Sequence, residues 1–442
     1  MKKPAAMILT GLVMLTAFTA CTDKNKLDPN EPITLTLWHV YGEQADSPMN
    51  RLIEEFNQTT GREKGIIIDV TLMSNASAIG TKLIDAQNGK PGVPAMPDLF
   101  FCHSSNAAEL GEDDLINWND MFTKAELDSY VPEFVDDGTV NDKLLVFPVS
   151  KSTHVLYIAG TQFERFSADT NVTYSDLSDW SGFFSAAEKY YEWSGGKPFC
   201  AIDYPIRCIE LNALEKGAGD LYTDDGWYDL DNEIFRGSWL EFAEAIAKGY
   251  IVAADLYSNT QVMTGEVAAG LGSSASVLYY NDTVTYPDNT SEPMDLQVLP
   301  MPKAKGEELL VTQAGVGLCA YKTTEQKTEA SKIFAEWLTE SDRNLEFCIE
   351  TGYMPVNKTS FDKIKDHSFS SEAYKNLYTA LCTVNETAQA VKEPSFSGYY
   401  QKIYTFYDEL RAQQSALAER YKNGEDAEEL ANELWEMFCS IK

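Results

Sequence analysis

The chain has little positive charge. Its 442 residues include 35 Lys and Arg against 68 Asp and Glu, which gives a formal net charge of −33 at pH 7. Nucleic acid is disfavoured as a partner, because phosphate backbones attract the opposite sign. An acidic surface of this kind mainly favours solubility.

Histidines and closely spaced cysteine pairs are also scarce. No HExxH motif occurs, and the chain has only four histidines: His39, His103, His154 and His367. None of the eight cysteines forms a CxxC pair, which argues against structural zinc. We therefore expect no metal and no cofactor. Cys200 and Cys208 are close enough in sequence to bridge a short loop, and most other cysteines lie in apolar runs as buried thiols do.

No long hydrophobic run follows the N-terminal segment. Residues 1–21 start with a basic pair, continue as an uncharged apolar run and end in Phe18–Cys21 (FTAC). This run is too short to span a membrane and predicts a signal peptide. Its end resembles a bacterial lipobox, although the first position of that motif is usually Leu. We expect Cys21 to be lipidated and residues 22–32 to form a polar tether, the alternative being an ordinary signal peptide with an incidental cysteine.

The rest of the chain has enough apolar residues for a large core. It is 44% hydrophobic and 12% aromatic, which at this length predicts two domains. The first hundred residues after the tether alternate between strand and helix patterns, and this βαβα order predicts a largely parallel sheet with helices on its faces. Ligands bind beyond the carboxyl ends of such strands. The expected strands are 34–38, 66–73 and 98–102, and the expected helices are 48–60, closed by Gly61, then 79–88 and 104–110.

Residues 143–163 form the segment around which we expect the fold to be organised. Two β-prone apolar runs, 144–147 and 155–158, flank the polar stretch 148–154. Such a polar elbow does not suit a core. We therefore expect it at a surface or in a cleft, as the first crossing between two lobes, with Ser152 and Thr153 facing the gap.

Helices dominate the chain beyond this crossing. The acidic and aromatic stretch 217–231 is expected to be a loop over the cleft, and 311–321 a strand that returns to the first lobe. The expected helices cover residues 174–193, 239–248, 325–339, 341–350, 371–384, 400–422 and 427–441.

Several segments resemble a known family. The stretch Pro148–Arg165 (PVSKSTHVLYIAGTQFER) is similar to PxNxSTxVLYYNxxxFE, a pattern of the family 1 extracellular solute-binding proteins of ABC importers. The resemblance extends to Leu35–Glu55, Gly272–Val277 and Thr351–Lys358, in the same order along the chain. Within the family, the glycerol-3-phosphate-binding branch is the nearest.

The resemblance implies an α/β fold of the type II periplasmic-binding-protein class, with two discontinuous lobes joined by hinge crossings. Lobe 1 would comprise residues 33–147 plus 311–355, and lobe 2 residues 148–310 plus 356–442. The implied protein is a monomeric, membrane-anchored binding protein on the extracellular face of the cell membrane. It would close over a small solute, deliver it to permease subunits in the membrane and catalyse no reaction.

Polar and aromatic residues at strand ends form the first part of the expected site. Trp38, His39 and Tyr41 combine flat rings with polar tips, which suits the two faces of a sugar ring. Ser104 follows the third strand, and Trp227 lies in the expected cleft loop. The alternative for Trp38 is core packing, and for His39 a turn.

Hydroxyl groups form the second part. Ser152 and Thr153 lie at the crossing, and Ser273 and Ser274 at the start of an expected helix, where free N–H groups bind oxygen-rich ligands. The alternatives are a local turn for the first pair and N-capping for the second. Tyr399 completes the residues expected from lobe 2.

The family's ligand contacts also map onto Gly315 and Tyr353, as well as onto Ser152 and Ser273 or Ser274. The phosphate-pairing Arg of the glycerol-3-phosphate branch falls within residues 398–404, where no Arg occurs. Without a bidentate guanidinium, an uncharged saccharide is the better candidate, although Lys151 or Lys402 could substitute in a polyol-phosphate-binding protein.

Other functions fit less well. The stretch Gly270–Ala275 formally fits GxGxxA but opens no βαβ unit, so a dinucleotide site is not expected. The acidic pairs, such as Asp136 and Asp137, could include the carboxylates of a surface glycan-degrading enzyme, but they lie in polar, turn-like contexts. A binding protein that serves a sensor kinase instead of a permease is a further alternative.

Overall fold

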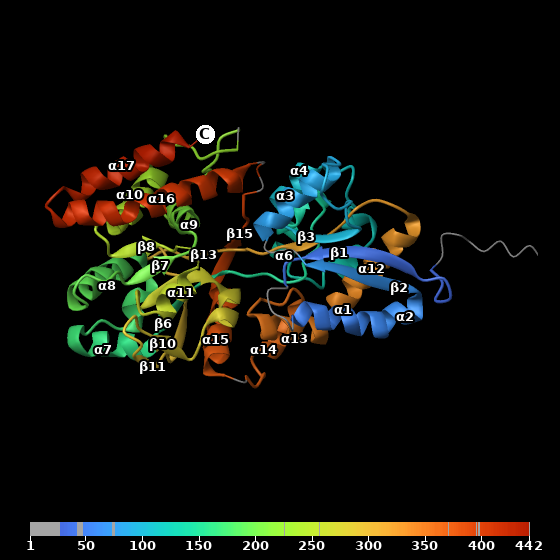
Figure 1. Ribbon diagram of the computed structural model, residues 1–442, viewed down its shortest axis with the longest axis horizontal. Coiled ribbons are helices and arrows are strands. Elements are labelled where there is room, and N and C mark those ends of the chain that lie inside the picture. The colour runs from blue at the N-terminus through green and yellow to red at the C-terminus, as the bar shows by residue number, and fades with distance from the viewer. Residues whose placement is uncertain are drawn as a thin grey trace, which may run out of the picture.

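A computed structural model shows two groups of elements along the long axis of the molecule (Figure 1). One group contains α1, α3, α4, α12 and the strands β1, β2 and β3, and the other contains α7–α10, α16, α17 and the strands β6–β8. The described residues are 27–41, 47–72, 76–224, 226–255, 257–369, 371–394, 396 and 398–441. Cys21 and the proposed tether up to residue 26 lie outside them.

The first group is built on a four-stranded sheet of order β14-β3-β1-β2. β1, β2 and β3 are parallel, as the βαβα pattern predicted, and β14 joins β3 antiparallel. Side chains of α3 and α4 pack on one face, and those of α1 and α12 on the other. The elements up to the first crossing are β1 (Ile33–His39), α1 (Pro48–Gln58), α2 (Thr60–Lys64), β2 (Ile66–Leu72), α3 (Ala76–Gln87), β3 (Leu99–Cys102), α4 (Ser104–Leu110), η1 (Trp118–Asp120), α5 (Lys124–Leu127), α6 (Pro132–Asp137), β4 (Thr139–Val140) and β5 (Lys143–Leu144).

The end of the first helix differs from the prediction. Gly61 does not close it, because α1 ends at Gln58 and the short α2 follows at once. Gly65, with φ 75°, ends α2 in the left-handed conformation that favours glycine.

The second group is built on a five-stranded sheet of order β12-β6-β9-β7-β8. β6 pairs antiparallel with both β12 and β9, whereas β7 is parallel to β8 and β9. The elements between the two crossings are β6 (His154–Ala159), α7 (Gly160–Thr170), η2 (Tyr174–Ser178), α8 (Trp180–Trp193), β7 (Cys200–Ile202), α9 (Pro205–Glu215), α10 (Glu233–Ala247), β8 (Ile251–Ala253), α11 (Ser258–Met263), β9 (Ala269–Ser273), η3 (Ser274–Tyr279), β10 (Thr283–Thr285), β11 (Ser291–Pro293), β12 (Leu296–Pro300) and β13 (Leu309–Thr312).

The C-terminal third is mostly helical, as expected. α15 packs on one face of the second sheet, and α16 and α17 pack among the helices on its other face. The remaining elements are β14 (Gly317–Ala320), α12 (Glu325–Leu338), α13 (Ser341–Thr351), α14 (Lys358–Ile364), α15 (Glu372–Thr387), β15 (Ala388–Val391), α16 (Tyr399–Lys422) and α17 (Ala427–Ser440).

Three chain segments run side by side between the two sheets. The backbone of Ser152 exchanges two 2.8 Å hydrogen bonds with Ala314, and Lys151 pairs in the same way with Met354. The elbow of residues 148–154 is therefore the middle of three adjacent crossings.

The expectation that this elbow is too polar to be buried is wrong. The exposed fraction is 1% for Lys151, 3% for Ser152 and 0% for Thr153. The neighbouring crossings satisfy its backbone groups, and the Lys151 ammonium forms an ion pair with the Asp137 carboxylate.

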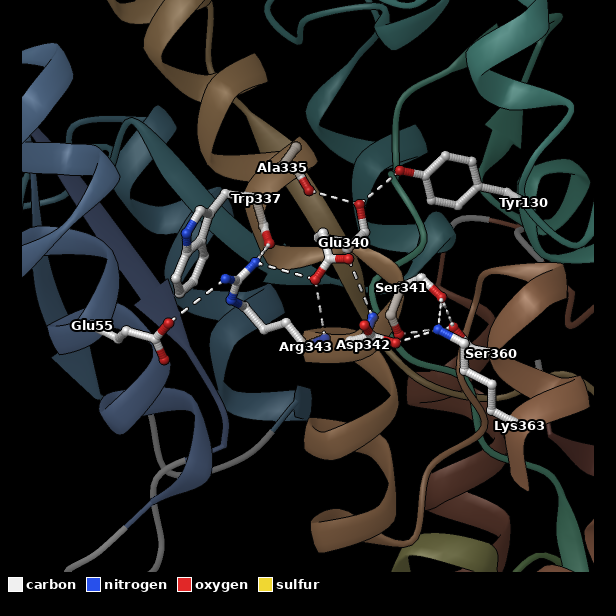
Figure 2. A network of polar contacts seen from close by, with 11 residues as sticks. Glu55, Tyr130, Ala335, Trp337, Glu340, Ser341, Asp342, Arg343, Ser360 and Lys363 are labelled. Atoms are coloured by element: carbon white, nitrogen blue, oxygen red, sulfur yellow. Dashed lines mark hydrogen bonds and ion pairs between the residues drawn. The ribbon is translucent and has the colours of Figure 1, made fainter. Parts of the chain in front are cut away.

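A polar network fixes the corner between α12 and α13 (Figure 2). The Arg343 guanidinium lies 3.9 Å from the ring centroid of Trp337 and donates a 2.9 Å hydrogen bond to the Trp337 carbonyl. The carboxylates of Glu55 and Glu340 are each 3.6 Å from it. Glu340 caps α13, because its carboxylate accepts hydrogen bonds from the backbone amides of Asp342 and Arg343.

Three further findings concern the described part of the chain. No helix there is both long and apolar enough to cross a membrane. Its residues contain no group of three or more Asp, Glu, His or Cys side chains that could hold a metal ion. Cys200 and Cys208, the pair considered for a disulfide, are both free and buried.

Candidate functional site

A small polar cavity lies where the two groups of elements meet. Its volume of about 10 Å³ is enough for one water molecule. It adjoins the carboxyl end of β3, the edge where a parallel sheet binds ligands. It is lined by His103, Ser104, Ser105, Asp137, Gly315, Glu393, Pro394 and Tyr400.

His103 contributes an imidazole from the first group of elements. It is the N-cap residue of α4, directly after β3, and its ring lies 5.4 Å from the ring of Tyr400. Burial lowers the pKa of His103, and Lys151 acts in the same direction, whereas Glu393 and Asp137 act against it. The imidazole is therefore neutral at pH 7.

Glu393 contributes a carboxylate from the other side of the cavity. It follows β15, and it accepts a 2.5 Å hydrogen bond from the Tyr400 hydroxyl on the first turn of α16. Its Oε2 atom is 3.7 Å from Nδ1 of His103. Since that imidazole is neutral, the negative charge of Glu393 is available to a ligand.

Asp137 supplies the second carboxylate, at the end of α6. It forms an ion pair with Lys151, whose side chain is 1% exposed, and its carbonyl accepts a 2.6 Å hydrogen bond from the Ser104 hydroxyl. Lys151 is thus occupied, and Lys402 lies over the ring of Trp227 at 5.0 Å. Neither lysine lines the cavity, whose acidic lining residues are Asp137 and Glu393.

Tyrosines surround the same junction. Burial raises the pKa of Tyr353, and its neighbours Tyr279 and Tyr257, which are 46% and 47% exposed, raise it further. Burial likewise raises the pKa of Tyr204, with smaller contributions from Asp203, Tyr404, Tyr257 and Glu393. Among the described residues, Tyr400 is the tyrosine that lines the cavity itself. Aromatic faces beside carboxylates are suited to rings that carry hydroxyl groups.

The structure brings several predicted site residues together at the crossings. Tyr41 contacts Tyr353 at 5.8 Å between ring centroids, and its hydroxyl lies 3.1 Å from that of Ser150. Gly315, with φ 114°, lies against the elbow next to Ser152. Ser104 and Gly315 both line the cavity.

The predicted serines of lobe 2 lie at the far end of the elbow. The Ser274 amide donates a 2.8 Å hydrogen bond to the Thr153 carbonyl, and no hydrogen-bond partner for either hydroxyl is found within the described residues. Ser273 accepts a hydrogen bond from the Ala275 amide, so it caps η3, as the alternative interpretation proposed. Gly352 packs against Ser274 and thereby places Tyr353 beside this end.

Ser104 and Gly315 are the predicted residues that line the cavity, and four others lie neither there nor among the contacts at the crossings just described. Trp38 is 3% exposed and packs under α3 and α4. The His39 imidazole is fully buried, lies 3.0 Å from the Asn50 amide oxygen and accepts a hydrogen bond from the Tyr41 amide. Trp227 packs against Phe438, and the stretch around it forms part of the second core instead of covering the cleft.

Tyr399 is the fourth predicted residue that lies away from the cavity. It points inward, and its hydroxyl lies 2.7 Å from that of Tyr228. Its neighbour Tyr400 faces the cavity instead, because consecutive side chains on a helix point in directions about 100° apart.

The two carboxylates and most of the tyrosines are not recognisable as site residues from the sequence. The turn-like context of Asp136 and Asp137 predicts solvent exposure, but Asp137 is only 6% exposed. Glu393 precedes a proline just before α16, and nothing in its local pattern distinguishes it from other surface acids.

A comparison with known families decides which proteins the chain is related to. Residues 51–376 match the family described as bacterial extracellular solute-binding protein. The chain belongs to this family. A search of curated proteins finds no match.

Solved structures of solute-binding proteins have the same two-lobed fold. The cyclic alpha-maltosyl-1,6-maltose binding protein from Arthrobacter globiformis has a TM-score of 0.67 and 16% identity, over 93% of this chain and 99% of that one. Maltose-bound MalE3 of T. maritima has a TM-score of 0.66 and 16% identity, and the match covers 92% of this chain and 99% of that one. UgpB from Mycobacterium tuberculosis, in complex with glycerophosphocholine, has a TM-score of 0.66 and 17% identity. The match covers 92% of this chain and 98% of that one.

Proposed function

We propose that this solute-binding protein captures a mono- or oligosaccharide between two lobes and delivers it to the permease of an ABC importer. The observation that carries this proposal is the junction of His103 and Asp137, from one group of elements, with Glu393 and Tyr400 from the other. Carboxylates accept hydrogen bonds from sugar hydroxyls, and the surrounding phenol rings cover the apolar ring faces. The sugars named for two of the structural relatives support the same ligand class.

The lobes are proposed to be residues 33–147 plus 311–355 and residues 148–310 plus 356–442. All strands of the first sheet fall in the former set, and all strands of the second sheet in the latter. The ligand would stabilise the closed arrangement, because residues from both lobes contact it only there.

A polyol phosphate is disfavoured by the charge of the site. Lys151 is already paired with Asp137, and Glu393 leaves a net negative charge that repels a phosphate. A glycan-degrading activity is also not proposed, because Lys151 neutralises Asp137 and the family consists of binding proteins.

The test is a thermal-shift screen with mono- and oligosaccharides, glycerol phosphates and amino acids, followed by calorimetric titration of the hits. Stabilisation by a neutral sugar without shortening of the sugar is the expected result. Stabilisation by glycerol phosphates alone, or shortening of an oligosaccharide, would contradict the proposal.

Anchoring is proposed to occur through a lipid on Cys21, with the binding protein itself monomeric. Metabolic labelling with a fatty acid tests the anchor, since Cys21→Ala would abolish the label. Fatty-acid label retained by the Cys21→Ala variant would contradict lipidation of Cys21. A sedimentation mass of twice the chain would contradict a monomer.

A further inference from the structure

Two cysteine thiols meet in the core next to the end of β3, where the cavity-lining residue His103 follows. Cys102 is the last residue of β3 and Cys319 lies in β14, and their Sγ atoms are 3.5 Å apart although 217 positions separate them in sequence. Both side chains are fully buried. Their closeness results from the return crossing, and no sequence spacing indicates it.

The strand pairing gives both side chains the same orientation. β3 and β14 are antiparallel, with Cys102 opposite Gly317 and Cys319 opposite Phe100. Residues two apart on a strand share a face, so the two cysteines are diagonal neighbours on one face of the sheet. Gly317 has no side chain to separate them. Closing the gap from 3.5 Å to the S–S bond length of about 2.05 Å requires rotation of both side chains together with a shift of the edge strand β14 toward β3.

The pair also lies next to the candidate site. Cys102 directly precedes His103, and Cys319 lies on the strand that follows Gly315. β14 is an edge strand of its sheet, held by β3 on one side. The family to which the chain belongs is extracellular, and disulfides form and persist in oxidising extracellular environments.

We propose that Cys102 and Cys319 form a disulfide that links the return crossing to the strand carrying the site. A small-molecule disulfide such as oxidised glutathione is the oxidant. One cysteine thiolate attacks it and forms a mixed disulfide with release of one glutathione thiolate. The second cysteine thiolate then displaces the other glutathione thiolate. The protein loses two thiol protons and two electrons, and the oxidant becomes two reduced thiols.

The link has a measurable consequence. It holds β14 against β3 and closes a very long loop of the unfolded chain, which lowers the conformational entropy of that chain. We expect the oxidised protein to have a melting temperature about 5 °C higher than the reduced protein.

The test starts from protein refolded in a mixture of oxidised and reduced glutathione, because the native thiols are buried. After acid quenching, the chain is denatured, alkylated with N-ethylmaleimide and digested. Mass spectrometry should find one cross-linked peptide joining Cys102 to Cys319. Recovery of both cysteines as alkylated peptides, or a Cys102 link to any other cysteine, would overturn the proposal.

Variants separate the link from general effects of oxidation. Cys102→Ala and Cys319→Ala should each abolish the difference in melting temperature between oxidised and reduced protein. Cys348→Ala removes another buried thiol and should leave that difference unchanged. A difference in melting temperature that persists in both single variants would contradict the Cys102–Cys319 disulfide. If a variant does not fold, the peptide analysis of the wild type still decides whether this disulfide forms.

Discussion

The imidazole of His103 and the carboxylate of Glu393 lie 3.7 Å apart, although they belong to different groups of elements. His103 caps the helix after β3, whereas Glu393 follows β15, which pairs with β13 beside the crossings. Tyr400 contacts both residues. Under the proposed function, a solute bound at this junction would contact both lobes at once, and its binding free energy would favour their closed arrangement.

Glu393→Gln tests the role of this carboxylate in binding. The substitution keeps the size of the side chain and one acceptor oxygen, but it removes the charge. Because hydrogen bonds to a charged acceptor contribute about 1.5–3 kcal/mol, the affinity for the preferred sugar should fall about 10- to 100-fold. Calorimetric titration measures this change. Glu386→Gln, at the exposed ion pair with Lys365, is the matched control and should bind as the wild type does.

Lys151→Met tests the buried ion pair. Lys151 is 1% exposed, and its removal leaves the Asp137 carboxylate buried without its partner. We expect the free energy of unfolding to fall by about 3–5 kcal/mol, measured by urea denaturation. Lys143→Met breaks the more exposed pair with Glu112 and should cost at most about 1 kcal/mol. Equal losses in the two variants would show that burial does not set the strength of the Lys151 pair.

Asp203→Asn tests a buried carboxyl at the end of β7. Burial raises the pKa of Asp203 to about 7, partly offset by a hydrogen bond from the Ser258 amide. The native state thus holds this proton more tightly than the unfolded state. Its contribution to stability is complete below about pH 4 and is lost as the pH rises through 7.

Asn cannot ionise, so the variant should gain stability relative to the wild type by roughly 2–3 kcal/mol between pH 5 and pH 8. Urea denaturation at the two pH values measures the difference. The contributions of other titrating groups, such as His39 with its pKa lowered to about 4 by burial, cancel because both proteins contain them. A stability difference that is the same at both pH values would contradict the raised pKa.

Arg343→Ala tests the corner between α12 and α13. The variant loses stacking on Trp337 and a hydrogen bond to its carbonyl, so we expect unfolding to become easier by about 1–2 kcal/mol. Arg343→Lys keeps the charge but not the planar stack, and it should recover only part of the loss. Arg62→Ala, at an exposed position on α2, is the control. If Arg343→Lys recovered all of the lost stability, the charge of residue 343, and not its stacking on Trp337, would be what stabilises this corner.

Local patterns predicted most elements but few of the contacts between them. The strand ahead of α1, the helix α4 and the long C-terminal helices are predicted by the sequence, because periodicity, proline and glycine act over a few residues. The burial of Lys151 was not found, because its partner Asp137 lies in a different element. Tyr399 was chosen over Tyr400 because the sequence alone does not show which side of α16 faces the cavity.

The sequence by itself determined the α/β class, the family and the acidic character of this protein, since these follow from composition, short-range pattern and motif order. Tertiary structure decided where Glu393 meets His103, which carboxylate pairs with Lys151 and which cysteines touch. Those facts depend on pairing between residues far apart in the chain. Three crossings bring these residues together, and no local pattern encodes their register.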